Sequence, residues 1–495
     1  MSNSKFEELN SIFFPRKTAV IGASPKDNYT YSLLATKMRD NLYFVNPNYG
    51  EVLGRKSYAS ILDIEAPVDY AVIAVPAQFV LGAVSDCIGK GVRGVHIFTS
   101  GFSETGLPEG IRLEKKLADL ASGKIRIIGP NCMGSYCPKS GLSFNPASTN
   151  VEGSIGVITQ SGTFAQMFVY AGRTMDMKIS KMVSYGNAVD LDCPDFLEYM
   201  ADDPDTSVIA LYIEGIKDGK RLRTALEYAA GKKPLVALKG GVTRAGGRVA
   251  SSHTGSLAGI GQTWSTMFKQ SGVVQVDDVD DLINTAKTMS SSAIPSGNGV
   301  SIVTYSGGFA VVQSDMCVKA GLQVPQFSQK AIDELRTFVP AAGTMIGNPL
   351  DSWQLFYKYS GEGRLSDVLR IVSGEKQIHS IILQFDVIRF MTLMWGQGAE
   401  EKLRAIAEDF LSGCRYARDK AGRLVVITVS LEPYTDNDLE RRLSVLLKKM
   451  CEEAAFPVFP SLKEAIRTVS CMCRYAATKK IDDKRGLRDG GRATL

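Results

Sequence analysis

Short apolar runs recur along the chain and alternate with longer stretches of mixed polarity. The first four runs occupy residues 18–21, 70–75, 95–98 and 126–128, and stretches long enough for helices separate them. Apolar runs of this length are typical of buried strands, and their alternation with helical stretches is typical of βαβ units. The pattern therefore predicts an α/β protein built on parallel sheets.

This alternation is interrupted at two polar stretches rich in Pro, Gly and Ser, residues 143–153 and 290–299. Strand-like runs start again after each of them. Stretches of this composition are typical of linkers, and a chain of 495 residues is long enough for about three domains. We therefore expect domains at residues 1–150, 151–292 and 293–480, followed by a charged, mobile tail at 481–495.

Composition narrows the class of protein. Charged residues make up 22% of the chain, the formal net charge is +5, and the cations are scattered among acids, so a nucleic-acid partner is not indicated. No apolar signal opens the chain and no apolar stretch is long enough for a bilayer, so we expect a cytoplasmic protein without a membrane segment. The 9 cysteines are spread out, and Cys471 and Cys473 point to different faces of a predicted helix. No metal site is predicted.

Each predicted domain begins with a buried strand, a small Gly-containing turn and a helix. The three turns lie in VIGASP from Val20, VITQSGTFA from Val157 and IVTYSGGFAVV from Ile302. Small residues let backbone N–H groups approach a ligand, and the helix dipole favours an anion there. The same turn also packs the first helix of any doubly wound sheet. Each turn alone is therefore compatible with a purely structural role.

The first turn argues against a dinucleotide. Such a site needs G-x-G-x-x-G and an acid near the end of the second strand. Residues 22–26 read GASPK, with one glycine, and the predicted second strand ends in Asn46-Pro47. A nicotinamide-dependent oxidoreductase is therefore disfavoured, whereas CoA remains compatible with the turn.

The segments VIGAS, VNPN, AVIAVPA, SGFSETG and IIGPNC follow one another along the first domain. In this order they resemble the CoA-binding domain of the nucleoside-diphosphate-forming acyl-CoA synthetases, which include succinyl-CoA synthetase and ADP-forming acetyl-CoA synthetase. The resemblance implies a Rossmann-like CoA-binding domain followed by two flavodoxin-like ligase domains. It implies CoA contacts from the strand ends, at Gly22, Ala23, Ser24, Lys26, Asn46, Pro47, Val75, Pro76, Ala77, Ser100, Gly101, Phe102 and Asn131.

Of the three histidines, His96 and His379 lie in or beside apolar runs, where a structural role is expected. His253 lies in SSHTGSLAG, whose small and hydroxylated residues leave room for a phosphoryl group, and residues 239–248 upstream supply glycines and cations that suit phosphoryl charge. A lone loop histidine is more often structural, but this string resembles the phosphohistidine loop of the same family. The resemblance implies that His253 carries the phosphoryl group and that Glu214 orients its imidazole.

The turns of the second and third domains resemble the paired helix amino ends that face the phosphohistidine in this family. The resemblance implies phosphate contacts from these turns and from the loop around His253, at Ser161, Gly162, Thr163, Ser252, Thr254, Gly255, Ser306, Gly307 and Gly308. We also expect Asn187, Asp190 and residues 339–353 to help shape the pocket for the acyl group.

Taken together, the resemblance implies an alpha-type subunit of an ADP-forming acyl-CoA synthetase. Such an enzyme converts a small carboxylic acid, CoA and ATP to acyl-CoA, ADP and phosphate, through phosphohistidine and acyl phosphate. The sequence has no G-x-x-x-x-G-K-[ST] loop and no ATP-grasp region, so ATP, ADP and Mg²⁺ are expected mainly on a separate ATP-grasp beta subunit in an α₂β₂ assembly. The alternative is a non-catalytic CoA-binding regulator or scaffold of the same fold.

Overall fold

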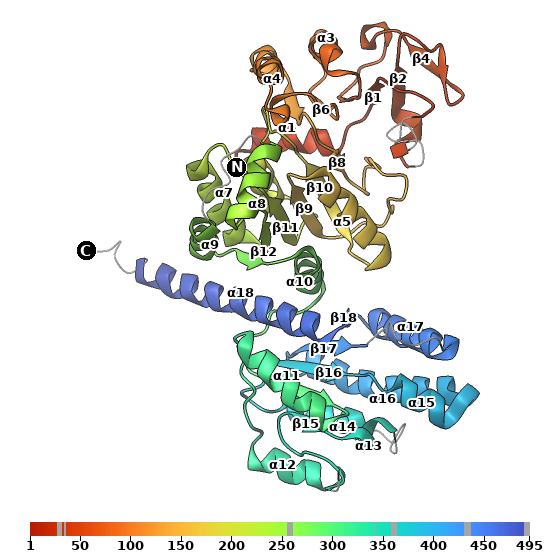
Figure 1. Ribbon diagram of the computed structural model, residues 1–495, viewed down its shortest axis with the longest axis vertical. Helices are drawn as coiled ribbons and strands as arrows, with labels where there is room; N and C mark the ends of the chain where they lie inside the picture. Colours follow the sequence, from red (N-terminus) through yellow and green to blue (C-terminus); the bar gives the residue numbers. More distant parts are fainter. Residues whose placement is uncertain are drawn as a thin grey trace. The chain divides into compact units, whose positions relative to one another are not determined.

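The computed structural model describes residues 1–26, 32–33, 36–254, 261–341, 343–357, 364–429 and 437–489; within these it leaves the side chains of 251–254 and 480–489 undescribed. The chain divides into two compact units, Met1–Ser290 and Ser291–Leu495 (Figure 1). Their described residues form three sheets with helices between the strands. This confirms the predicted α/β fold class. Among the described residues, no helix is long and apolar enough to cross a membrane.

The first sheet of the first unit has the strand order β3-β4-β2-β1-β5-β6-β7. Its neighbouring strands are parallel except for the β3–β4 pair. The order reverses at β1, which pairs with both β2 and β5, and ligands of open α/β sheets bind at such a reversal. The strands are β1 (Thr18–Ile21), β2 (Leu42–Val45), β3 (Glu51–Val52), β4 (Arg55–Tyr58), β5 (Tyr70–Ile73), β6 (Gly94–Ile97) and β7 (Arg126–Ile128).

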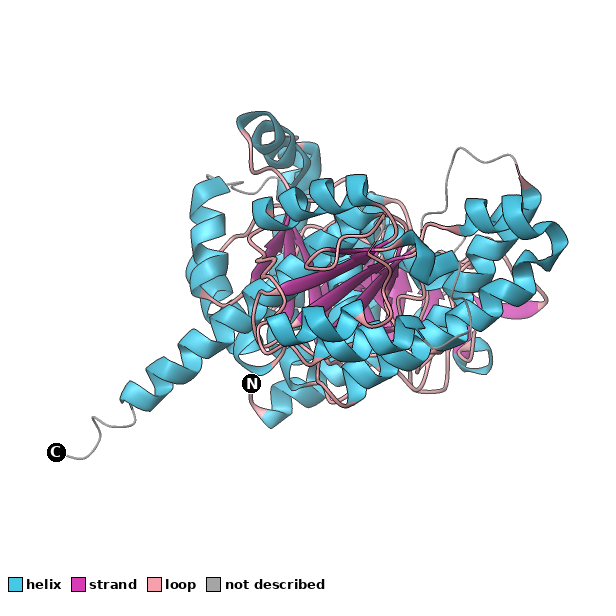
Figure 2. Ribbon diagram, turned by 90° about the horizontal axis from the view of Figure 1, so that it is seen from below, coloured by secondary structure: helices cyan, strands magenta, loops and turns pink. Residues whose placement is uncertain are grey.

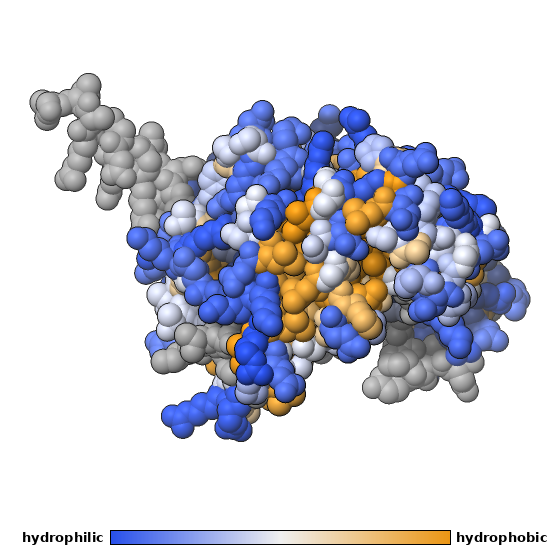
Figure 3. Space-filling view, turned by 90° about the horizontal axis from the view of Figure 1, so that it is seen from above, coloured by the Kyte–Doolittle hydropathy of each residue, from blue (hydrophilic) through white to orange (hydrophobic). Residues whose placement is uncertain are grey.

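Helices α3 (Ala77–Lys90) and α4 (Pro108–Ala121) bury apolar side chains against this sheet. Val80, Val84 and Leu117 pack with Ile73 in one core cluster. The solvent-facing side of α3 and α4 also carries apolar side chains, since Phe79, Leu107 and Ile111 are more than half exposed. Figure 3 looks onto the molecule from above and shows apolar side chains gathered in the middle of that face.

The second sheet has the order β13-β12-β11-β9-β10-β8. All its pairs are parallel except β8–β10, so a strand that precedes the predicted boundary at residue 150 forms the edge of the second sheet. Right-handed crossovers place α5 on one face and α6 and α7 on the other. The elements are β8 (Gly134–Tyr136), β9 (Ile155–Thr159), α5 (Gly162–Thr174), β10 (Ile179–Ser184), α6 (Cys193–Asp202), β11 (Val208–Ile213), α7 (Gly219–Lys232), β12 (Leu235–Lys239), α8 (Arg244–Thr254), α9 (Gly261–Gln270), β13 (Val274–Val276) and α10 (Val279–Ser291).

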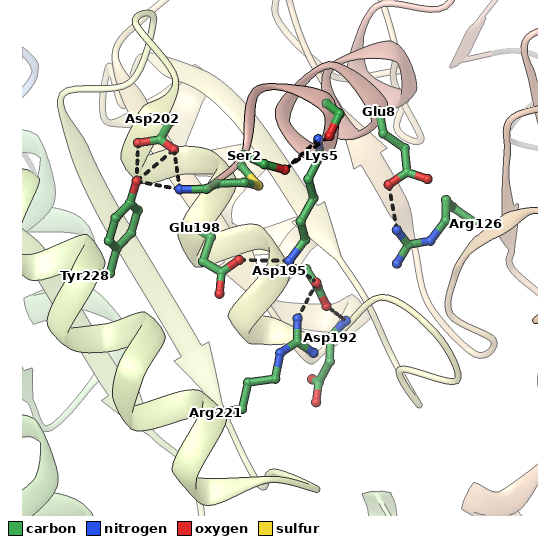
Figure 4. Close-up of polar contacts among 12 residues, drawn as sticks. Ser2, Lys5, Glu8, Arg126, Asp192, Asp195, Glu198, Asp202, Arg221 and Tyr228 are labelled. Carbon is green, nitrogen blue, oxygen red and sulfur yellow. Dashed lines mark hydrogen bonds and ion pairs between the residues drawn. The ribbon is translucent and has the colours of Figure 1, made fainter. Parts of the chain in front are cut away.

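Helix α1 (Asn3–Phe13) joins the two sheets of the first unit. Phe6 and Phe13 stack on Tyr199 of α6, with ring centroids 5.2 and 5.1 Å away. Beside this apolar contact, Lys5 forms an ion pair with Asp195 of α6 at 3.1 Å (Figure 4). Arg221 of α7 also hydrogen-bonds to Asp195. One buried carboxylate is therefore shared by cations from two other helices.

The second unit has one all-parallel sheet in the order β15-β14-β16-β17-β18. Helices cover both of its faces (Figure 2). Leu369, Phe410 and Leu447 pack against Val303 and Ile381 in the core. The elements are β14 (Val300–Thr304), α11 (Gly307–Lys319), α12 (Gln329–Arg336), β15 (Leu350–Asp351), α13 (Trp353–Tyr357), α14 (Arg364–Ser373), β16 (Ser380–Gln384), α15 (Ile388–Trp395), α16 (Ala399–Asp419), β17 (Leu424–Thr428), α17 (Asp438–Glu453), β18 (Val458–Phe459) and α18 (Leu462–Asp489).

Helix α18 continues to Asp489, into the segment for which the composition predicts a mobile tail. Short 3₁₀ helices complete the two units, at Arg39–Asn41, Ile61–Asp63, Ser103–Thr105 and Gly396–Gly398.

Candidate active site

A cavity of about 690 Å³ lies in the first unit, between the carboxyl ends of strands from the first sheet and the amino end of α5. Val75–Ala77 follow β5, Phe98–Ser100 follow β6, and Asn131–Met133 follow β7; Gln160–Thr163 approach from β9 of the second sheet. The cavity thus brings together part of the predicted CoA segment and the whole of the first predicted phosphate turn, namely Val75, Pro76, Ala77, Ser100, Asn131, Ser161, Gly162 and Thr163.

The turn after β1 lies at the same edge of the sheet but does not line the cavity. Gly22 has φ 94°, and a Cβ added there would lie 2.4 Å from the carbonyl oxygen of Ala74. Its N–H donates to the carbonyl of Val45 at 2.8 Å, and the Asn46 amide donates to the carbonyl of Ala23 at 2.9 Å. The predicted CoA contacts Gly22, Ala23, Ser24, Lys26, Asn46 and Pro47 therefore form a tight corner beside the cavity.

The turn after β6 has its backbone donors occupied. The Glu104 carboxylate accepts hydrogen bonds from the N–H groups of Gly101, at 2.5 Å, and Phe102, at 3.1 Å. The Phe102 side chain is fully buried in the core beneath α3 and α4. Of this predicted segment, Ser100 lines the cavity, whereas Gly101 and Phe102 fix the shape of the turn.

Asn187 connects the two sheets at the cavity. Its Nδ2 donates to Glu104 at 2.6 Å and to Glu114 of α4 at 2.8 Å, and its Oδ1 accepts from Asn131 at 3.3 Å. Asn187 thus lines this cavity, and its expected part in a pocket for the acyl group stays a prediction. Asp190 does not, because its carboxylate binds Arg126 at 2.8 Å and the backbone N–H of Ile127 at 2.9 Å.

The amino end of α5 points its first turn at the cavity. Ser161 caps the helix by accepting a hydrogen bond from the N–H of Phe164 at 3.4 Å. A Cβ at Gly162 would lie 3.0 Å from Met133, so the absence of a side chain lets the segment after β7 approach the helix. The positive end of the helix dipole favours an anion at this position.

Glu214 lies at the end of β11 and is 7% exposed. Its carboxylate accepts a hydrogen bond from the Tyr212 hydroxyl at 3.0 Å. The side-chain oxygen of Gln160, which lines the cavity, accepts from the N–H groups of Glu214 at 2.8 Å and Gly215 at 3.1 Å. Burial, and then the Glu214 charge, raise the pKa of Tyr212. Glu214 therefore does not line the cavity itself, but its backbone is bound to Gln160, which does.

Lys239 begins the segment that is expected to supply cations for phosphoryl charge, and its side chain is buried. Its ammonium group donates to the carbonyl oxygen of Glu214 at 2.7 Å and to that of Gly240. The Trp264 ring centre lies 4.8 Å away. Burial lowers the pKa of Lys239 to about 8, against the opposing effect of Glu214. Lys239 thus anchors the strand end and is directed at backbone oxygens.

His253 belongs to the last turn of α8, where the sequence predicts a loop. The side chains of Ser252, His253 and Thr254, and residue Gly255, lie outside the described residues. The contact between His253 and Glu214 therefore stays a prediction. His96 is buried, with its ring nitrogen 3.0 Å from the carbonyl oxygen of Cys132, and burial lowers its pKa to about 4.

The second predicted phosphate turn lies in the second unit. Ser306 and Gly307 line a cavity of about 570 Å³ at the amino end of α11, together with Asp351 and Trp353 of the predicted acyl segment. Gly308 does not line it. Because the two Ser-Gly turns belong to separate units, their expected pairing around one phosphohistidine also stays a prediction.

Sequence reasoning missed several residues of the first cavity. Thr99, Met133, Gln160 and Gln166 contribute to its lining. Gln160 directly precedes the Ser-Gly turn, and its position in that motif was the available signal. Met133 and Gln166 carry no signal of their own, since an apolar residue after a strand and a glutamine within a helix are common in any α/β domain.

Comparisons with known proteins agree with this geometry. Residues 16–138 match the family described as CoA binding domain, and residues 152–289 match the succinyl-CoA ligase like flavodoxin domain. A CoA-binding domain followed by this ligase domain defines the class of CoA ligases related to succinyl-CoA ligase.

Two relatives from Pyrococcus furiosus are alpha subunits. The alpha subunit of ADP-forming acetate–CoA ligase II is 41% identical over 348 residues, 69% of this chain and 76% of that protein. The alpha subunit of ADP-forming acetate–CoA ligase I is 33% identical over 488 residues, 95% of this chain and 98% of that protein. The structure of Ca. Korarchaeum cryptofilum acetyl-coenzyme A synthetase 1, solved with phosphate and ADP, is 27% identical, has a TM-score of 0.81, and matches 96% of this chain and 98% of its own.

The chain therefore belongs to the family of ADP-forming acetate–CoA ligase alpha subunits. This membership confirms the family resemblance and the enzyme class, an ADP-forming acid–thiol ligase. It leaves the roles of individual residues as predictions.

Proposed function

We propose that this chain binds CoA and carries the phosphoryl group in an ADP-forming acyl-CoA synthetase, and that a separate ATP-grasp subunit phosphorylates it. The observation that carries the proposal is the first-unit cavity, in which strand ends of a CoA-binding domain meet the amino end of α5. A thiol ester is made where the CoA thiol and the activated acid meet, so a CoA edge and an anion-favouring helix end in one cavity suit this reaction.

The reaction divides one difficult transfer into easier ones. The γ-phosphoryl group of ATP forms a P–N bond with His253 as the bond to ADP breaks. A carboxylate oxygen of the acid then takes the phosphoryl group, which frees the imidazole and gives an acyl phosphate. Finally the CoA sulfur attacks the acyl carbon, the thioester forms, the thiol proton is lost, and phosphate leaves.

In this proposal Glu214 accepts a hydrogen bond from one ring nitrogen of His253, which fixes the tautomer and leaves the other nitrogen to attack phosphorus. The buried position of Glu214, held by Tyr212 and Gln160, supports a positioning role, because a fixed carboxylate loses little freedom on binding the imidazole. The amino end of α5 stabilises the phosphoryl charge.

A separate subunit is supported by the relatives. The Pyrococcus furiosus proteins are named as alpha subunits, whereas this chain spans 49% of the Methanocaldococcus jannaschii ADP-forming acetate–CoA ligase, which it matches at 37% identity. We propose that the remaining function, binding of ATP and Mg²⁺, belongs to an ATP-grasp beta subunit and that the assembly is α₂β₂.

The test is co-expression with a candidate ATP-grasp subunit followed by incubation with γ-labelled ATP. We expect an acid-labile, alkali-stable label on this chain, absent from His253→Ala. His379→Ala is the matched control, because His379 lies in the other unit with its ring nitrogen 2.9 Å from Ser296, and it should keep the label. Label that persists in His253→Ala would refute the assignment. CoA binding without any label would favour a non-catalytic regulator instead.

A further inference from the structure

His96 lies within β6 of the first sheet and is 1% exposed. It pairs in register with Val72 of β5 and Ile128 of β7, so its neighbours in the sheet are apolar. Taking a polar ring out of water costs free energy unless the ring gains a hydrogen bond. None of the proposed reaction steps uses His96, so its hydrogen-bond partner indicates what it does.

The partner of His96 is a backbone carbonyl. Nε2 of the ring lies 3.0 Å from the carbonyl oxygen of Cys132. A carbonyl oxygen only accepts hydrogen bonds, so Nε2 carries the proton and donates it. Burial lowers the pKa of His96 to about 4, although the bond to Cys132 acts in the opposite direction. The ring is therefore neutral at physiological pH, with its proton on Nε2.

The same peptide unit is also held at its N–H group. The N–H of Met133 donates to Oγ of Ser184 at 3.1 Å. Ser184 is the last residue of β10 and is buried. One peptide plane, between Cys132 and Met133, is thus bound by a side chain from each sheet of the first unit. Because hydrogen bonds are directional, a bond at each end opposes rotation of the plane.

The ring of His96 also packs beside this peptide. Gly134 follows Met133 at the start of β8, and a Cβ added there would lie 2.5 Å from Cγ of the ring. Gly134 has a φ of 76°, which favours glycine. The ring therefore lies directly against the backbone of β8, and it contacts the chain both before and after Met133.

The segment that these contacts fix is part of the first cavity. Asn131, Cys132 and Met133 line it, and they lie between β7 and β8, outside both strands. Asn131 has a φ of 58°, which costs free energy for a residue with a side chain unless surrounding contacts hold it. Its N–H donates to the carbonyl of Thr99 at 3.0 Å. This irregular stretch of the wall depends on such individual contacts.

We propose that His96 and Ser184 are positioning residues for CoA. By fixing the peptide between Cys132 and Met133, they hold Asn131 and Met133 as a preformed part of the wall against which CoA binds. A preformed wall raises affinity because the ligand does not have to order it on binding. This inference rests on the proposed function, which makes CoA the ligand of this cavity, and it adds two residues that do not themselves line the cavity.

Calorimetry of CoA binding to the purified full chain tests the role of His96. His96→Leu removes the donor but keeps a side chain of similar size, and we expect it to weaken CoA binding about tenfold. His96→Gln keeps a side-chain N–H donor, so its affinity should stay within about threefold of the wild type. Unchanged affinity in His96→Leu would overturn the proposal, and equal losses in the two variants would contradict the role of the hydrogen bond.

Tyr136→Phe is the matched control. The buried Tyr136 side chain also donates to a backbone carbonyl, that of Thr149, at 2.9 Å, but Tyr136 does not line the cavity. Denaturant unfolding should show a loss of stability in both Tyr136→Phe and His96→Leu, because each leaves a carbonyl without its donor. Only His96→Leu should bind CoA more weakly. Similar CoA affinities in the two variants would mean that His96 contributes to stability alone.

Ser184→Ala tests whether both contacts act through one peptide. Each single variant releases one end of the plane, so the second release should matter less after the first. We expect the loss of CoA affinity in the double variant His96→Leu/Ser184→Ala to be smaller than the product of the two single losses, by about threefold or more. Losses that simply multiply would show two independent effects and would overturn the shared role.

The complete enzyme separates this inference from the proposed function. With the partner subunit and γ-labelled ATP, His96→Leu should form phosphohistidine at the wild-type level, because the peptide that it affects belongs to the CoA-binding domain. It should raise the KM for CoA about tenfold with little change in kcat. A wild-type chain that binds no CoA would contradict the proposed function and this inference with it. Normal CoA binding and phosphohistidine in the wild type, with an unchanged KM in His96→Leu, would contradict the role of His96 alone.

Discussion

At the scale of single residues, Gly22 shows how closely the first sheet packs at the carboxyl ends of its strands. Two independent constraints require glycine at this position. Its φ of 94° disfavours any side chain, and a Cβ would collide with the carbonyl oxygen of Ala74. A substitution therefore disturbs both the backbone of the turn and its contact with the end of β5.

We expect Gly22→Ala to lower the free energy of unfolding by about 2 kcal/mol or more and to weaken CoA binding. Gly91→Ala is the matched control, because Gly91 also has a positive φ, 79°, but has open space where its Cβ would lie. Gly91→Ala should lower the free energy of unfolding by only about 1 kcal/mol, the cost of the left-handed backbone conformation for a residue with a Cβ. It should leave CoA affinity unchanged. Denaturant unfolding and CoA calorimetry check both; equal losses in the two variants would mean that the collision with Ala74 is relieved.

Lys239 offers a pH-dependent test at the same scale. Its folded-state pKa of about 8 lies below the ordinary value of 10.5, so the folded state binds fewer protons than the unfolded state between these values. The free energy of unfolding contributed by this group must therefore rise with pH from about 8 to 10.5. Below pH 8 the cost of burying the charge is present in full.

The comparison that isolates this effect is wild type against Lys239→Met. From pH 7 to 10.5, the difference in free energy of unfolding should shift in favour of the wild type by on the order of 3 kcal/mol, at about 1.4 kcal/mol per pKa unit. Denaturant unfolding at intervals over this range measures it. Lys319→Met, which removes a side chain that is 79% exposed, should show no such trend. A constant difference for Lys239→Met would mean that the ammonium group titrates normally.

At the scale of helices and strands, the sequence predicts the buried elements well and the contacts between distant elements poorly. The apolar runs of β1, β5, β9 and β14 were recognisable because both faces of each strand are covered, so that every position is buried and most positions are apolar. Strand β8 has no comparable run, since it is a short antiparallel edge strand whose place depends on a sheet formed by later residues. Its membership of the second sheet is set by tertiary pairing.

The candidate site divides in the same way. The sequence motifs identified the turns and strand ends that line cavities. Ser161 and the strand ends line the first cavity, and Ser306 lines the second. Glu104 was missed as the group that binds its own turn. Lys239 was expected among the cations for phosphoryl charge, but its ammonium group binds backbone oxygens. Both errors concern charged side chains, whose partners depend on which backbone groups the fold leaves within reach.

Helix α1 gives a prediction at this scale. Burial opposes ionisation of Asp195, but its hydrogen bonds and the charges of Arg221 and Lys5 outweigh this and lower its pKa. The stability from this group is therefore present above the unfolded-state pKa, near 3.8, and is lost as pH falls through the folded-state pKa. The pairing holds α1 and α7 against α6.

Asp195→Asn should lower the free energy of unfolding by about 1–3 kcal/mol at pH 7, below the cost of breaking a fully buried pair because Lys5 is 30% and Arg221 40% exposed. The difference from wild type should shrink in acid. Asp333→Asn is the control, since that carboxylate and its partner Arg336 are both 60% exposed, and it should cost less than about 0.5 kcal/mol. Thermal and denaturant unfolding measure both; similar costs would mean that Asp195 contributes no more than a surface pair.

At the scale of the whole molecule, the two candidate ligand sites lie in different compact units. Every residue that lines the first cavity falls between Ala74 and Asn187, within Met1–Ser290, and every residue that lines the second falls between Tyr305 and Met394, within Ser291–Leu495. Binding of CoA is therefore expected to depend on residues of the first unit.

A chain that ends at Ser290 tests this separation. It keeps both sheets of the first unit and the α1 contacts that join them, so it should fold alone, as compact units of this size generally do. We expect its CoA affinity to remain within about twofold of the full chain, because no lining residue is lost. Circular dichroism establishes the fold of the fragment, and calorimetry measures its CoA affinity. A folded fragment that no longer binds CoA would mean that the second unit contributes to the CoA site.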